Sequence, residues 1–192
     1  MEYYHENKAF EHINMAEDMI TDVEFVDCCF ESCTFENCLI DRCRFTDCQF
    51  VNCRITNVKA EDTTMMDCGF IHCSLIGISW SALFGGGYIM PINRLEDCQL
   101  KYNNFVEMNF AKFDFSNNVM MECMFADCNL SASKFLKCDL SRTEFFKCNL
   151  NKADFREAAG YAIDLSTNQL KGARFSFPEV INLLNGLGII ID

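Results

Sequence analysis

The sequence predicts an all-β coil of short, stacked strands, and three observations support this fold class. A large apolar residue recurs at every fifth position, a small residue (most often Cys) lies two positions before it, and the remaining positions are mainly polar. A period of five fits neither a helix, at 3.6 residues, nor a strand, at 2. It fits a coil in which each five-residue unit forms one side and must stack on copies of itself to bury its apolar groups.

The large apolar series defines the extent of the coil. It runs over the 34 multiples of five from Phe10 to Phe175, and only Ala60, Gly85 and Gly160 are not large and apolar. Thirteen of the 14 cysteines share the small inward position, and Cys29 is the exception. We therefore expect thirteen buried, reduced thiols that act as small core residues.

Four segments identify a known repeat. They are CNLSA (128–132), CDLSR (138–142), CNLNK (148–152) and ADFRE (153–157). These units resemble the pentapeptide-repeat family, whose pattern is A-(D/N)-L-x-x. The resemblance implies a right-handed quadrilateral β-helix with four units per turn, so residues 20 apart should stack in one column.

We expect three regions: a lead-in over 1–9, the β-helix over 10–177, and a capping helix with its tail over 178–192. The segment 81–92 is either a projecting loop or an irregular coil, because it holds the only glycine run, Gly85, Gly86 and Gly87. The apolar series resumes in phase at Leu95, so any insertion there must be a multiple of five residues.

The C-terminal segment has the spacing of a short amphipathic α-helix that begins at Pro178. Its apolar residues are Val180, Ile181, Leu183, Leu184 and Leu187. They either cap the last coil only or also form a homodimer contact. Dimerisation is what a resemblance to the Qnr/MfpA-type quinolone-resistance group implies.

Composition and motifs argue against several functions. The net charge of −12 disfavours direct contact with nucleic acid or an anionic membrane. The sequence contains no long apolar run and no secretory signal, so a cytoplasmic protein is expected. Cysteines five residues apart do not converge on a metal, and no catalytic set is recognisable, so we expect no enzyme, metal site or cofactor.

Charge provides the functional hypothesis. A 20-residue coil would align five acidic residues in one ladder with no large insertion near 81–91: Asp27, Asp47, Asp67, Glu107 and Asp127. Either these acids are solvated turn residues, or they imitate the phosphates of DNA for a basic protein channel. The Qnr/MfpA-type resemblance implies binding to a type II topoisomerase such as DNA gyrase, with a change in its activity or quinolone sensitivity. The alternative is a scaffold or regulatory module for another protein.

Overall fold

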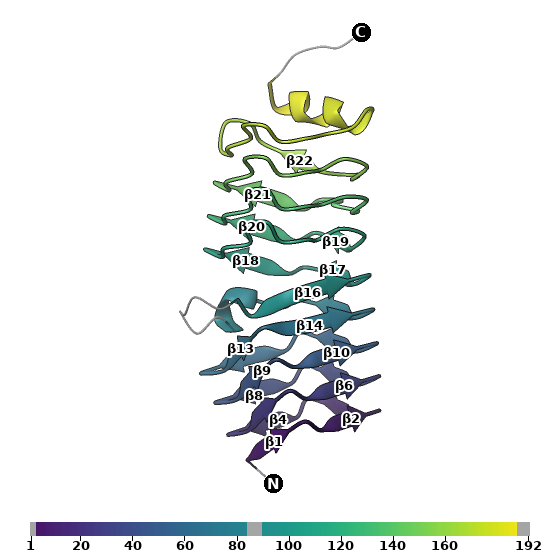
Figure 1. Ribbon diagram of the computed structural model, residues 1–192, viewed down its shortest axis with the longest axis vertical. Coiled ribbons are helices and arrows are strands. Elements are labelled where there is room, and N and C mark those ends of the chain that lie inside the picture. The colour runs from purple at the N-terminus through teal and green to yellow at the C-terminus, as the bar shows by residue number, and fades with distance from the viewer. Residues whose placement is uncertain (1–2, 84–89, 188–192) are drawn as a thin grey trace. The chain divides into compact units, whose positions relative to one another are not determined.

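The computed structural model describes residues 3–83 and 90–187, and it confirms an all-β parallel solenoid (Figure 1). The chain forms two compact units, the N-terminal unit over Met1–Asn104 and the C-terminal unit over Phe105–Asp192. Among the described residues, no helix is long and apolar enough to cross a membrane.

Parallel sheets form the four sides of the N-terminal unit. The first contains β1 (Tyr4–Glu6), β5 (Glu24–Val26), β9 (Arg44–Thr46) and β13 (Thr64–Met66). The second contains β2 (Ala9–Glu11), β6 (Cys29–Glu31), β10 (Gln49–Val51), β14 (Cys68–Ile71) and β16 (Ile92–Glu96). The third contains β3 (Asn14–Ala16), β7 (Thr34–Glu36), β11 (Arg54–Thr56), β15 (Ser74–Ile76) and β17 (Gln99–Lys101). The fourth contains β4 (Met19–Thr21), β8 (Leu39–Asp41) and β12 (Lys59–Glu61).

The register of this unit changes once. Strands pair at a step of 20 residues, as in Phe30 opposite Phe50, until the last coil. There the step becomes 25, because Phe70 pairs with Leu95 and a bridge joins Ser79 to Asn104. One extra five-residue unit is therefore inserted. The expectation that every coil contains 20 residues, with no large insertion near 81–91, is wrong.

The insertion lies around the predicted irregular segment. A 3-10 helix, η1 (Trp80–Leu83), comes first, and the chain has rejoined the coil by Met90, whose carbonyl accepts a 2.9 Å hydrogen bond from the Asp67 amide. The glycines of the candidate loop, Gly85, Gly86 and Gly87, lie outside the described residues. Inserting a whole five-residue unit leaves every later residue with the same inward or outward orientation. The sequence pattern therefore did not reveal the insertion.

The corners of the coil have one backbone conformation. Twenty-seven non-glycine residues adopt positive φ between 44° and 65°, one in nearly every repeat unit. Asp and Asn tolerate this left-handed conformation better than most residues. The corner amides donate to the next coil, as Asp27 N does to Thr46 O at 3.0 Å.

The interior is filled by stacked aromatic rings and small residues. Phe30 and Phe50 stack at 4.8 Å between ring centroids, and so do Phe135 and Phe155. This spacing equals the separation of neighbouring strands. The burial of thirteen cysteines is confirmed, with Cys29 only half-buried. Burial raises the pKa of the Cys138 thiol to about 12, which keeps it protonated.

The C-terminal unit has fewer regular strands. They are β19 (Val119–Met121), β20 (Met124–Ala126), β21 (Glu144–Phe146) and β22 (Ala162–Ile163), and β18 (Asn104–Val106) spans the boundary. Isolated parallel bridges complete the coil at a step of 20, as between Asn129 and Asn149.

The last coil departs from the predicted register. Phe145 pairs with Ile163, a step of 18, so Ile163 is buried and Leu165 is 38% exposed. The expectation that Leu165 points inward is wrong. The buried ring of Tyr161 follows Gly160, whose φ of 73° turns the chain early.

The C-terminal helix is present, but its type differs from the prediction. Glu179–Leu187 form a 3-10 helix, η2, rather than an α-helix. Asn182 donates its side-chain amide to the Glu179 carboxylate at 3.0 Å, and Gly186 is a poor α-helix former. The same carboxylate accepts the Gly160 amide at 3.2 Å, which ties the helix to the last coil.

Candidate functional site

Charge is concentrated in the N-terminal unit. This unit holds 17 acidic and 7 basic residues, whereas the C-terminal unit holds 11 and 9. An acidic binding face should therefore be sought on the N-terminal unit.

Asp27, Asp47 and Asp67 stack at one corner of this unit, which we call the acidic corner. They follow β5, β9 and β13, whose strands pair in register. Their φ values are 50°, 53° and 49°, and the Asp47 amide donates to Met66 O at 3.0 Å. Successive residues are thus one strand spacing apart, about 4.8 Å. Asp27 and Asp47 are exposed and Asp67 is half-buried.

The acidic corner has no ion-pair partner in the described part of the chain. Its neighbours in the same coils carry no charge: Val26, Thr46 and Met66 before it, and Cys29, Gln49 and Gly69 after it. None of the three aspartates forms an ion pair with another described residue. Carboxylates about 5 Å apart repel each other by about 1 kcal/mol even at the dielectric constant of water.

The other three corners of the unit are internal controls, because they share the same backbone conformation. The second carries His12, Ser32, Asn52, His72 and Asp97. The third carries Glu17, Asn37, Asn57, Gly77 and Tyr102. The fourth carries Asp22, Arg42 and Asp62. The left-handed conformation therefore accepts neutral and basic residues, and only the acidic corner stacks three like charges.

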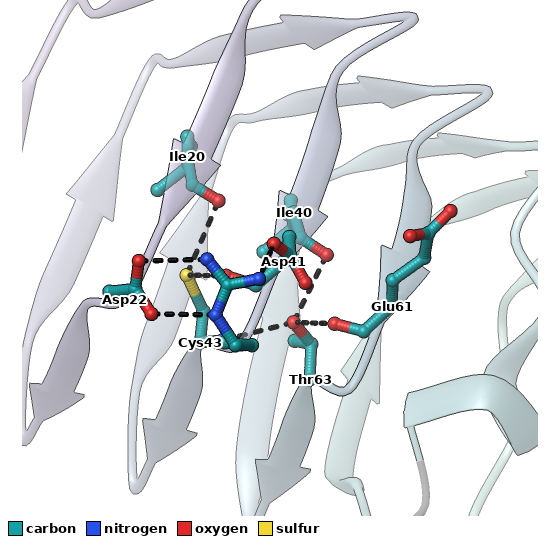
Figure 2. Close-up of polar contacts among 8 residues, drawn as sticks. Ile20, Asp22, Ile40, Asp41, Cys43, Glu61 and Thr63 are labelled. Atoms are coloured by element: carbon teal, nitrogen blue, oxygen red, sulfur yellow. Dashed lines mark hydrogen bonds and ion pairs between the residues drawn. The ribbon is translucent and has the colours of Figure 1, made fainter.

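Figure 2 shows the ion pairs that partly neutralise the fourth corner. The Arg42 guanidinium donates to both carboxylate oxygens of Asp22, from Nε at 2.7 Å and from Nη2 at 2.9 Å, and it also pairs with Asp41. The hydrogen bonds from Arg42 lower the pKa of Asp22. Sequence reasoning overlooked Arg42, although its position between Asp22 and Asp62 at 20-residue spacing was visible.

The same close-up shows a polar ladder inside this corner (Figure 2). The Cys43 thiol donates to Ile20 O at 3.4 Å, and the Cys43 amide donates to Thr63 Oγ1 at 3.1 Å. Thr63 Oγ1 in turn donates to Ile40 O at 3.0 Å. The small inward residues therefore satisfy backbone groups at the corners, which is a structural role.

The predicted single ladder of five acids is not what the structure shows. Because of the insertion, the acidic corner continues from Asp67 to Pro91, rather than to residue 87, since Cys68 pairs with Ile92 and the Asp67 amide donates to Met90 O. Glu107 and Asp127 share a corner of the C-terminal unit with Lys147, as the amide bonds Glu107 N to Ala126 O and Asp127 N to Phe146 O show. The ladder is thus confined to three acids in the N-terminal unit.

The predicted dimer residues lie on η2. Val180, Leu183 and Leu184 are half-buried, and Ile181 is 39% exposed. Leu187 ends the helix. In residues 3–83 and 90–187, no cluster of three or more His, Cys, Asp or Glu side chains could hold a metal.

A parallel coil with four short sides, a five-residue period and left-handed corners defines a class of solenoid built from pentapeptide repeats. Residues 30–74 match a family model of pentapeptide repeats with nine copies, and residues 123–158 match one with eight copies. The chain is therefore a pentapeptide-repeat protein.

A solved structure of a fluoroquinolone resistance protein shares this fold at low sequence identity. A trypsin-treated form of QnrB1, a plasmid-mediated fluoroquinolone resistance protein, is 13% identical, with a TM-score of 0.50 over 96% of this chain and 100% of that one. HetL, a pentapeptide-repeat protein involved in heterocyst differentiation regulation in the cyanobacterium Nostoc, is 15% identical, with a TM-score of 0.34 over 86% of each chain. No curated protein matches the chain.

Proposed function

We propose that this protein works without catalysis, by using the acidic corner to bind a basic protein surface that otherwise holds DNA. The stack of Asp27, Asp47 and Asp67 carries the proposal, because neighbouring corners with the same backbone avoid like charges. Local structure favours Asp or Asn at these positions but does not require three carboxylates. A binding partner gives a reason for keeping the charge.

The spacing of the charges suits a channel built for phosphates. One strand of B-DNA presents a charge about every 3.4 Å along its axis, and the acidic corner presents one about every 4.8 Å. Attraction of this kind speeds encounter and weakens as salt rises. The fold shared with a fluoroquinolone resistance protein supports a type II topoisomerase, DNA gyrase first, as the partner to test.

The test compares two double variants in a gyrase supercoiling assay, with and without a fluoroquinolone. Asp47→Asn with Asp67→Asn removes two charges from the acidic corner, and Asn keeps the left-handed backbone. Glu17→Gln with Glu36→Gln removes two exposed charges from the third corner and the sheet beside it, and serves as the matched control.

The parent and the control should alter gyrase activity or its inhibition by the drug, and the Asp47/Asp67 variant should do so at least about tenfold less well, since it loses two ionic contacts. A parent protein with no effect on gyrase would favour a scaffold for another partner. Equal effects of the two double variants would show that the acidic corner is only a solvated surface.

We also propose that η2 joins two copies of the chain. Its Ile181 is exposed, Phe177 just before the helix in sequence is 83% exposed, and Leu184 remains half-buried. Replacing Leu184 with Asp should halve the mass measured by light scattering and leave the β-sheet circular dichroism signal unchanged, because a charge in an apolar interface is costly. A parent protein that is monomeric at tens of micromolar would refute the dimer.

A further inference from the structure

The N-terminal unit contains a cavity of about 390 Å³ along its interior. The inward residues of three successive coils line it, from Ile20 and Phe25 to Met65 and Phe70, and so does Trp80. The lining is therefore almost wholly apolar, and the length spanned by three strand spacings is about 14 Å. Cavities of this size fall in the range of ligand sites.

The cavity exists because the fourth side of the unit lacks a large residue. Ile20 and Ile40 occupy this inward column in the first two coils, and Ala60 follows them. The side chains of Val58 and Ala60 are only half-buried, whereas Ile55 and Met65, on either side of them in sequence, are 9% and 6% exposed. Core space that larger residues fill elsewhere is thus open at Ala60.

A break in the sheet forms the mouth of the cavity. On this side the Cys38 carbonyl accepts the Lys59 amide at 3.0 Å, and the Ile78 carbonyl accepts the Asn104 amide at 2.9 Å. Between them, the Val58 carbonyl accepts no backbone hydrogen bond from a described residue. The helix η1 faces β12 across this break, and Lys59, Glu61 and Ser79 supply the polar rim.

We propose that this cavity binds a single aliphatic chain with a polar end. An almost wholly apolar lining suits an alkyl chain, and the rim offers charged and hydroxyl groups to the polar end. Apolar cavities accept apolar ligands without losing ordered water. A bound chain would also stabilise the folded unit through mass action.

Trp80 makes the proposal testable, because it is the only tryptophan of the chain and lines the cavity. Its side chain is 1% exposed, and its Nε1 donates to Asn103 Oδ1 at 3.0 Å, so bulk quenchers cannot reach the ring. A long-chain fatty acid with bromine at its methyl end should quench Trp80 fluorescence saturably. The unbrominated acid should compete with it and cause no quenching itself.

Ala60→Ile places in the third coil the residue that the first two coils already carry. It should raise the melting temperature. It should also raise the concentration of brominated fatty acid at half-saturation by at least about tenfold, because the isoleucine occupies space that the alkyl chain requires. Ala126→Ile adds the same atoms to the outer surface of β20 in the C-terminal unit and should bind like the parent. Ala60→Val supplies a smaller obstruction should the isoleucine variant fold poorly.

The outcomes separate clearly. Absence of saturable quenching in the parent, or equal quenching in the parent and both Ala60 variants, would overturn the proposal. An equal loss of quenching in Ala126→Ile and Ala60→Ile would overturn the proposal as well. Phosphatidylcholine vesicles that carry brominated chains form a second arm: quenching there identifies membrane lipid as a source of the chain, and quenching by the free acid alone identifies the free amphiphile.

Discussion

The two units use their acidic residues in different ways. In the N-terminal unit, the three residues of the acidic corner have no ion-pair partner among the described residues. In the C-terminal unit, Asp and Asn recur at positions that precede a multiple of five, and a side-chain oxygen accepts the amide two residues later. Those residues are Asn109, Asp114, Asn129, Asp139, Asn149, Asp154 and Asp164.

This difference separates structural acids from acids available for binding. A carboxylate that closes a turn contributes to folding and is often paired, as Asp154 is with Arg156 at 2.7 Å and Asp114 with Lys134 at 3.1 Å. The carboxylates of the acidic corner close no such turn. Their charge is therefore free to act outside the molecule, and the two units should respond differently to the same kind of substitution.

Core packing should show the largest difference. Phe135 is fully buried and stacks on Phe115 and Phe155 at 4.9 and 4.8 Å, so Phe135→Ala should cost about 3–5 kcal/mol. Phe45 lines the cavity and has fewer neighbours to lose, so Phe45→Ala should cost less, about 2–3 kcal/mol. Urea unfolding followed by circular dichroism measures both. Equal costs would mean that the two cores are packed alike.

A turn carboxylate should show the next largest effect. Asp154→Ala removes the bond to the Arg156 amide and the ion pair, and should destabilise the C-terminal unit by about 1–2 kcal/mol at neutral pH. The hydrogen bond from the Arg156 side chain lowers the pKa of Asp154 in the folded protein. The stabilisation is therefore present above the pKa of the unfolded chain, near 4, and is lost as pH falls through the lower folded value.

Thermal unfolding between pH 3 and pH 7 checks this prediction. The difference in melting temperature between the parent and Asp154→Ala should narrow as the solution becomes acidic. Asp154→Asn is the matched control, since it can keep the turn hydrogen bond and loses only the charge. A gap that stays constant over the whole range would contradict the role of the ionised carboxylate.

The sequence predicted what depends on the five-residue period and missed what leaves that period intact. Thirteen buried cysteines follow from the inward phase, which every repeat unit enforces through burial, whereas the four sides of the coil were implied by the resemblance to pentapeptide repeats. The insertion before Leu95 adds one whole unit, so it shifts columns without shifting the phase. The prediction of a single ladder of five acidic residues was wrong for this reason. Such a ladder requires residues 20 apart to stack in one column, and the inward phase alone does not guarantee this.

Other departures arose from local competition. Ile163 replaced Leu165 in the core because the early turn at Gly160 moved the chain by two residues, and both side chains are equally apolar. The cavity at Ala60 could have been suspected from the sequence, since Ala60 interrupts a column of isoleucines. The opening beside it could not, because it arises where no described residue donates a backbone hydrogen bond to the Val58 carbonyl.

The smallest expected effect concerns repulsion within the acidic corner itself. Asp47→Asn with Asp67→Asn removes like charges about one strand spacing apart, so it should stabilise the N-terminal unit by about 1 kcal/mol at low salt. In 1 M salt the screening length falls to about 3 Å, and the gain should vanish.

Asp127→Asn is the comparison in the C-terminal unit, where Glu107 on one side and Lys147 on the other have opposite charges. Repulsion and attraction nearly cancel there, so no gain is expected at any salt concentration. The measurement is thermal unfolding of the three proteins at about 20 mM and about 1 M salt. Charges one strand spacing apart are weakly screened at the lower concentration and strongly screened at the higher one. An equal, salt-dependent gain in Asp127→Asn would show that corner acids repel generally and that the acidic corner of the N-terminal unit is not special.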